Sequence, residues 1–411
     1  MTPVYEEAGS HPVTFIWETG LVETITRNLT KIYNTKLFQK LVVYVLREVA
    51  KRLGGGVGGK GPGEPMKLSE IEAELNRIDK FDRFDKGARG GAQLMTERDV
   101  AEQRGVEADL QDILDKDNFP DFVESGEAET EYLAPHIGQQ GNGQAKGLIS
   151  LGLFVKLLAK VAYASMIRFV QGRDHGLYPT VAEEVLRELY LADFGAWVWS
   201  GMKDVAVAMW AANQVPINDD SHVGTYFLEK LVAFQMTNAG LSVDLIGHSA
   251  GSIAICQMFR AAAQRGITLS VRHVIFLAPA CTSELMCQEI VSHPQRFTDF
   301  RMFTMSDAFE VKDQLVHGIY TRSLLYFISG VLEQASDVPL AGLVRYLSAQ
   351  KPYDAPDLVR IANWLKEPGK NRIVQSVTSD VTPGLVSSST THGDFDDDFP
   401  TLESIKAIIS A

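Results

Sequence analysis

The feature that most constrains this chain is a Gly-x-Ser-x-Gly pentapeptide between two regular patterns. The β-prone run at residues 243–246 leads into Gly247, and residues 252–264 are rich in Ala, Ile, Met and Phe at helical spacing. The order strand, sharp turn, helix holds the central residue, Ser249, in a strained conformation that exposes its hydroxyl above the sheet. We expect both flanking glycines, Gly247 and Gly251, to be needed because a Cβ would clash with the neighbouring strand and helix.

Ser249 is therefore a candidate nucleophile. The N-terminus of the next helix directs free backbone N–H groups toward the position where an oxyanion would form, and Ala250 would supply one of them. The pentapeptide alone also occurs in ordinary loops. Its position between a strand and a helix favours the nucleophile turn.

The residues Gly247-His248-Ser249-Ala250-Gly251 in this context resemble the α/β-hydrolase superfamily. The resemblance is strongest from Leu241 to the C-terminus and weak over most of residues 1–240. It implies an α/β fold with a mostly parallel sheet, helices on both faces and a large helical cap insertion. It also implies an acid and a histidine that follow the serine in chain order.

Three more β runs are expected after the Gly-x-Ser-x-Gly turn, which we call the elbow. A last helix is expected at about residues 401–409. The runs cover residues 271–278, 300–305 and 372–377. Strands that alternate with helices predict a parallel sheet whose carboxyl ends gather the loops. Ser249, Asp307 and His392 would all lie at that edge.

His392 is the candidate base and Asp307 the candidate acid. His392 is the only histidine after the last predicted strand, and a serine hydroxyl needs a base that a carboxylate orients. Asp307 directly follows its strand, where the family has its acid. Glu310 and Asp313 lie in the same turn and remain alternatives, because spacing cannot fix which carboxylate faces the imidazole.

No metal and no cofactor are expected. Aspartates follow His392 at positions 394 and 396–398, but their spacing does not match an EF-hand loop. They could raise the pKa of His392 if they lie close to it.

Val13–Trp17 is predicted to be a buried strand that ends in a glycine turn. The resemblance implies that the backbone N–H of Leu21 completes the oxyanion hole, although Thr19 stands where the family usually has His. A strand followed by a simple turn is the alternative. Two strands normally precede this one in the family, so either the sheet is reduced or the chain begins further upstream.

We divide the chain into an α/β-hydrolase core, residues 1–33 and 223–411, and a mostly helical cap or insert, residues 34–222. A glycine-rich segment near residues 54–65 is expected to be a flexible loop. Part of it matches the phosphate-loop pattern Gly-x-x-x-x-Gly-Lys. It lacks the preceding strand and the following Ser or Thr that such a loop needs.

The most apolar stretch is residues 148–170. Lys156, Lys160 and Arg168 would form one narrow charged stripe on a helix there. A packed cap helix and a lipid-facing helix that contacts a membrane peripherally are both compatible with this pattern. The two central lysines argue against a membrane span.

The composition limits the kinds of partner that we expect. A net charge of −13 disfavours nucleic acid as a partner, because it repels the phosphate backbone. The N-terminus lacks a secretory signal, so a cytoplasmic location is expected. Cys256, Cys281 and Cys287 are interpreted as buried free thiols. His175, beside a glycine before a helix, is interpreted as a turn or capping residue. The oligomeric state is not determined by the sequence.

We therefore expect a serine hydrolase that cleaves a carboxylic ester, with a small-molecule ester or a lipid as substrate. Apolar cap helices suit an acyl chain better than a peptide. The alternative is a non-catalytic protein of hydrolase fold whose helical insert binds a partner or a membrane surface. An interfacial lipase is a further alternative.

Overall fold

The protein contains a parallel sheet of four strands, and its strands confirm the predicted α/β class. The strands are β1 (Asp244–His248), β2 (Val271–Leu277), β3 (Phe297–Met305) and β4 (Ile373–Ser376). They lie in the order β1-β2-β3-β4, and each neighbouring pair is parallel. This computed structural model describes residues 2–16, 20–52, 97–125, 130–133, 151–190, 196–213, 222–379 and 381–411.

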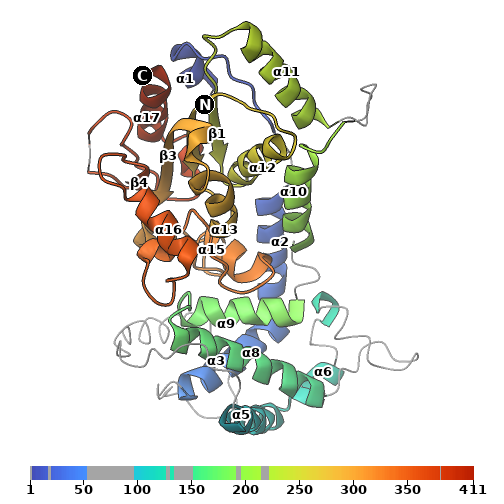
Figure 1. Cartoon of the computed structure of the whole chain (residues 1–411). Coiled ribbons are helices and arrows are strands. Elements are labelled where there is room, and N and C mark those ends of the chain that lie inside the picture. The colour runs from blue at the N-terminus through green and yellow to red at the C-terminus, as the bar shows by residue number, and fades with distance from the viewer. Residues whose placement is uncertain are drawn as a thin grey trace.

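Helices cover both faces of the sheet (Figure 1). Side chains alternate along β2, so Phe276 packs into the same cluster as α12 (Gly251–Gln264), whereas Ile275 packs with α17 (Phe399–Ser410). The short helix α1 (Thr2–Glu7) lies beside α17. This alternation explains why the strands read as continuous apolar runs, as expected for a parallel sheet buried on both faces.

The loops after all four strands lie together at the carboxyl ends of the strands, because the strands are parallel. This carboxyl-end edge carries Ser249 after β1, residues 306–313 after β3 and the long segment after β4 that contains His392. The topology therefore brings together residues that lie more than a hundred positions apart in the sequence.

The described residues between 36 and 208 form helices and no strand. Figure 1 shows α3, α5, α6, α8 and α9 as a group on one side of the sheet-bearing part, with α2 extending between the two and α10 beside α12. The glycine-rich segment near residues 54–65 lies outside the described residues. The bounds of the larger helices up to β1 are α2 (Leu21–Tyr33), α3 (Lys36–Arg52), α5 (Glu97–Lys116), α6 (Phe119–Glu124), α8 (Leu151–Gln171), α9 (Leu177–Val185), α10 (Ala196–Ala208) and α11 (Val223–Thr237).

Short helices make up much of the remaining chain. The remaining α-helices are α13 (Ser283–Met286), α14 (Asp307–Glu310), α15 (Leu324–Phe327) and α16 (Pro356–Leu365). The 3-10 and π turns are η2 (Thr130–Tyr132), η3 (Leu186–Tyr190), η5 (Cys287–Val291), η6 (Pro294–Arg296), η7 (Ile328–Leu332), η8 (Val344–Ser348) and η9 (Asp394–Asp396).

The predicted strand at Val13–Trp17 is wrong for its described part. Residues 11–16 have no regular structure, and the side chains of Val13 and Ile16 are 55% and 80% exposed. Trp17 lies outside the described residues. Phe15 packs against the rings of Trp210 and Phe227 instead of a neighbouring strand, so its apolar character reflects aromatic packing and not membership of the sheet.

The apolar helix expected at residues 148–170 is present as α8, and it packs against the other helices of its group. Its buried side includes Phe154 and Leu158, and Lys156 and Lys160 are exposed. The predicted charged stripe is wrong for Arg168, which is buried. No helix in the described part of the chain has both the length and the apolarity that crossing a membrane requires.

A buried network of charged side chains joins this helical group to the sheet-bearing part. The ring of His175 lies between two carboxylates: Nδ1 is 2.9 Å from Glu183 Oε1 and Nε2 is 3.1 Å from Asp337 Oδ1. Arg168 forms an ion pair with Glu183 at 2.8 Å, and the Tyr320 hydroxyl donates to the same carboxylate. Both ring nitrogens of His175 therefore face carboxylate oxygens, which accept hydrogen bonds from ring N–H groups. The network fixes α8 and α9 to the residues after η7.

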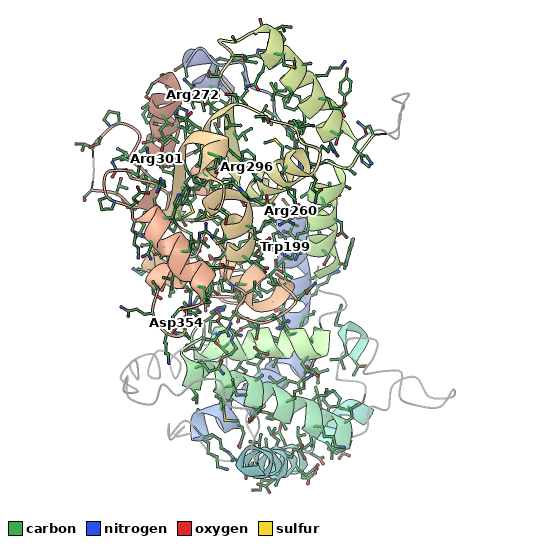
Figure 2. The ribbon with its side chains drawn as sticks, in the orientation of Figure 1. Trp199, Arg260, Arg272, Arg296, Arg301 and Asp354 are labelled. Carbon is green, nitrogen blue, oxygen red and sulfur yellow. The ribbon has the colours of Figure 1, made fainter. Side chains whose placement is uncertain are left out.

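Further polar contacts tie elements that are distant in sequence (Figure 2). The indole N–H of Trp199 on α10 donates to Glu333 Oε1 at 2.8 Å, just beyond η7. Arg272 on β2 pairs with Asp244 on β1 through two hydrogen bonds, of 3.0 and 2.6 Å. A bidentate pair of this kind fixes the register of the two strands near their amino ends.

Candidate active site

The predicted elbow is present between β1 and α12. Ser249 has φ +50°, a left-handed value that is rare for a residue with a side chain. Its N–H donates to the carbonyl of Leu277 on β2 at 2.9 Å, and its own carbonyl accepts from the Ser252 hydroxyl and the Ala280 N–H. These three bonds hold the strained residue in place. Strain of this kind is kept where the surrounding structure over-determines it.

The two glycines of the elbow differ in the space around them. A Cβ on Gly247 would lie 2.8 Å from the carbonyl carbon of Gly251 and 2.9 Å from a methyl of Ile255, which no ordinary packing allows. A Cβ on Gly251 would meet nothing within 4 Å. The sequence expectation that both glycines avoid a clash is therefore correct for Gly247 and wrong for Gly251.

The structure brings His392 to the serine. Nε2 of His392 lies 3.0 Å from Oγ of Ser249, across 143 residues of sequence. The imidazole is buried, whereas Ser249 is partly exposed. Burial, with a contribution from the neighbouring His248, lowers the pKa of His392 to about 3. The ring is therefore neutral at physiological pH, and a neutral Nε2 can accept the hydroxyl proton.

The three candidate acids have different surroundings. Asp307 accepts the hydroxyl of Tyr326 at 2.7 Å, and that tyrosine also accepts from Arg345. Asp313 accepts the backbone N–H of His392 at 2.9 Å. Burial, reinforced by the charges of Asp313 and Asp307, raises the pKa of Glu310 well above its usual value. A raised pKa disfavours the carboxylate form that stabilises an imidazolium, and neither oxygen of Glu310 has a hydrogen-bond partner among the described residues, so the surroundings of Glu310 argue against it.

No carboxylate is hydrogen-bonded to the second nitrogen of the imidazole. Nδ1 of His392 is buried and has no hydrogen-bond partner in the part of the chain that the structure describes. Asp313 contacts the same residue through its backbone only. Burial raises the pKa of Asp313 and the nearby charge of Asp394 adds to this effect, while the N–H of His392 opposes it. Of the three carboxylates, Asp313 is the one in contact with His392.

The two predicted oxyanion donors, Ala250 and Leu21, differ in their position relative to Ser249. Ala250 directly follows Ser249, and its N–H donates no hydrogen bond to any described residue. It precedes α12, whose N-terminus favours negative charge. Leu21 is the buried first residue of α2, after Gly20 with φ +54°. No hydrogen bond joins Leu21 to Ser249 within the described residues.

Sequence reasoning missed the role of His248, the residue before the serine. Its ring is stacked with the ring of His392, with centroids 5.4 Å apart and planes 30° apart. Its Nε2 lies 3.1 Å from the carbonyl oxygen of His392. The only available signal was its position inside the pentapeptide, which did not distinguish it from a spacer. His175 does lie in a bend before α9, as interpreted, but sequence reasoning missed that its ring is the centre of the buried network.

The aspartates after His392 mainly organise their own loop. Asp394 accepts the backbone N–H groups of Thr390 and Thr391 at 2.9 and 2.8 Å, and Asp398 caps α17 through the N–H of Thr401. Among the described residues, no group of three or more His, Cys, Asp or Glu is arranged to hold a metal ion. All three cysteines are buried and free, as expected.

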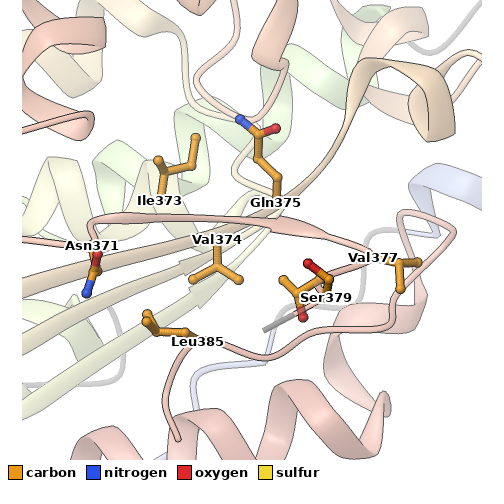
Figure 3. Close-up of a pocket in the computed structure, with 8 residues that line it drawn as sticks. Asn371, Ile373, Val374, Gln375, Val377, Ser379 and Leu385 are labelled. Carbon is orange, nitrogen blue, oxygen red and sulfur yellow. The ribbon is translucent and has the colours of Figure 1, made fainter. Parts of the chain in front are cut away.

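One open cavity lies at β4, the edge strand of the sheet opposite β1 (Figure 3). It has a volume of about 330 Å³ and follows β4 and the segment after it. Its lining includes Gln375, Val377 and Ser379, and no candidate catalytic residue. We therefore give it no role in the chemistry of Ser249.

Comparisons with protein-family models, with curated proteins and with solved structures found no match to this chain.

Proposed function

We propose that this protein is a serine hydrolase of the α/β-hydrolase type that cleaves carboxylic esters. One observation carries the proposal: the 3.0 Å contact between Ser249 Oγ and His392 Nε2, made by a serine with φ +50° between a strand and a helix. A strained serine within hydrogen-bond reach of a neutral imidazole is the arrangement that activates a hydroxyl for nucleophilic attack.

In the proposed reaction, Ser249 Oγ attacks the ester carbonyl while Nε2 of His392 takes its proton. The N–H of Ala250, with Leu21 as the second expected donor, stabilises the negative charge that forms on the carbonyl oxygen. His392 then returns the proton to the departing alcohol, which leaves an acyl group on Ser249. Water, deprotonated by the same imidazole, releases the acid and restores the serine.

We assign the role of the acid to Asp313 before Asp307. Asp313 already contacts His392, whereas the carboxylate of Asp307 is engaged by Tyr326, which Arg345 holds in turn. While Nε2 accepts a proton, Nδ1 carries the other hydrogen, and a buried N–H without an acceptor costs about 1–3 kcal/mol. A carboxylate that accepts this hydrogen removes that cost and stabilises the imidazolium.

A serine-directed fluorophosphonate probe tests the proposal directly. We expect the wild-type protein to be labelled once, and Ser249→Ala to lose the label entirely. Ser270→Ala is a matched control because Ser270 is exposed and lies directly before the amino end of β2, away from the proposed site. A folded wild-type protein that takes no label contradicts the assignment. An ester series of increasing acyl length would then define the substrate.

The acid is tested by two matched substitutions. Asp313→Asn is expected to lower kcat by roughly two to four orders of magnitude, since it removes the carboxylate charge that contacts His392 and would stabilise the imidazolium. Asp307→Asn should retain most of the activity, because its carboxylate faces Tyr326. The reverse ranking would restore Asp307 as the acid.

The alternative is a non-catalytic protein of the same fold whose helical insert binds a partner or a membrane surface. The observation that favours it is the Nδ1 of His392, which lacks the carboxylate partner of a complete triad among the described residues. The fluorophosphonate experiment separates the two, because a binding protein without an activated serine takes no label.

A further inference from the structure

The backbone of His392 is held at both of its polar groups by side chains from other elements. Its N–H donates to Asp313 Oδ2 at 2.9 Å, and its carbonyl accepts from His248 Nε2 at 3.1 Å. Asp313 follows α14, whereas His248 ends β1. At His392, the loop that carries the proposed base is therefore fastened to two other elements, in addition to the bond that Ser376 of β4 makes to the carbonyl of Ser389.

His248 is well suited to fix the base relative to the nucleophile. It is the last residue of β1 and directly precedes Ser249, so its main chain is fixed by the sheet. Its ring is also stacked with that of His392, at a centroid distance of 5.4 Å. One side chain thus contacts the proposed base through a hydrogen bond and through a ring face.

The usual means of orienting a catalytic histidine is absent from the described residues, because Nδ1 of His392 has no partner there. We propose that His248 is a positioning residue, which holds the imidazole of His392 at hydrogen-bond distance from Ser249 by donating to the carbonyl of His392 and stacking on its ring. This inference rests on the proposed hydrolase function.

The charges around His248 give the proposal a second readout. His392 lies against its ring, and Asp396 Oδ2 lies 3.9 Å from Nδ1. Tyr5 of α1 is close enough to Asp396 for its pKa to be raised by that charge as well as by burial. After burial, His248 is the second cause of the lowered pKa of His392. Replacing His248 should therefore raise the pKa of the base.

Two variants of the full chain separate the two contacts. His248→Phe keeps a flat ring but cannot donate to the carbonyl of His392. His248→Gln keeps an N–H donor at about the reach of Nε2 but lacks the imidazole ring. The measurements are the second-order rate of fluorophosphonate labelling of Ser249 across pH, kcat and KM on a short-chain ester, and the urea midpoint as a check of folding.

We expect His248→Phe to slow labelling at pH 7 by roughly 10- to 100-fold, through kcat and not KM, because a displacement of about 1 Å between reacting groups has effects of this size. His248→Gln should recover most of the rate, and the acid limb of its pH profile should lie at higher pH than that of the wild type.

A His248→Phe variant that labels as fast as the wild type overturns the inference and leaves the proposed hydrolase intact. If the phenylalanine variant does not fold, the glutamine variant carries the test, and an acid limb unchanged from the wild type overturns the inference. A folded wild-type protein that takes no label overturns the proposed function, and this inference with it.

Discussion

Removing the imidazole at the centre of the buried network should destabilise the protein strongly. In His175→Ala, Glu183 and Asp337 lose the imidazole that both of them contact, at 2.9 and 3.1 Å. All three side chains are at most 1% exposed, so water cannot replace the lost partner. Removing one partner of a buried ion pair costs about 3–5 kcal/mol. Two lost hydrogen bonds to charged groups, at about 1.5–3 kcal/mol each, give about 3–6 kcal/mol, which overlaps that range.

Urea unfolding followed by tryptophan fluorescence measures this loss. With a stability change of about 4 kcal/mol and an m value of roughly 4 kcal/mol/M at this chain length, the midpoint should fall by about 1 M. The control is Lys116→Ala, which breaks the pair with Asp112, whose two side chains are 65% and 60% exposed. An exposed pair of this kind contributes no more than about 0.5 kcal/mol.

The pH dependence gives a second check. Although burial alone would raise it, the charges of His175 and Arg168 lower the pKa of Glu183 to about 2, and contacts with His175 lower the pKa of Asp337 as well. A carboxylate with a lowered pKa stabilises the fold above its unfolded pKa near 4, and this contribution is lost as the pH falls through the folded pKa. The difference between wild type and His175→Ala should therefore be full at pH 7 and shrink between about pH 5 and pH 2. A difference below about 1 kcal/mol at pH 7, or one that grows on acidification, would refute the reasoning.

Two further predictions concern the proposed active site. Gly247→Ala should lose about 1–3 kcal/mol of stability in the same urea assay, because the added Cβ overpacks the elbow. Gly251→Ala has open space around its Cβ and should stay within about 0.5 kcal/mol of the wild type. Equal losses of stability in the two variants would contradict the difference in packing. Because the pKa of His392 is lowered to about 3, the rate of fluorophosphonate labelling should stay level down to roughly pH 5, and an acid limb centred near 6.5 would show that the ring titrates like an exposed histidine.

The elements around the serine could be predicted from sequence because their signals are local. The apolar run before Gly247, the helical pattern after Gly251 and the later β runs each specify their own structure within a few residues. The parallel arrangement follows from their alternation with helices. His392 could be predicted because only one histidine follows the last strand, and the parallel topology brings its loop to the serine edge.

The predictions that failed depend on contacts distant in sequence. Val13–Trp17 has the composition of a strand, but composition does not reveal whether a neighbouring strand exists, and Phe15 finds aromatic partners instead. His175 reads as a turn residue because its second carboxylate, Asp337, lies 162 positions away. Arg168 reads as part of an exposed stripe for the same reason, since helical periodicity alone does not reveal the glutamates of α9 that bury it.

The choice of acid shows why spacing is a weak guide within a loop. Asp307 lies two residues after β3, close to where the resemblance predicted the acid. Six residues further on, the chain has turned enough for Asp313 to bond His392 instead. Asp307 could accept a hydrogen bond from His392 only after losing its bond with the hydroxyl of Tyr326. That tyrosine also bonds Arg345, and its ring packs edge-on against the ring of His175. The carboxylate nearest the strand is thus bound into the network that fixes the helical insert. Asp313 is the carboxylate in contact with the proposed base, and the strand pattern could not specify its position.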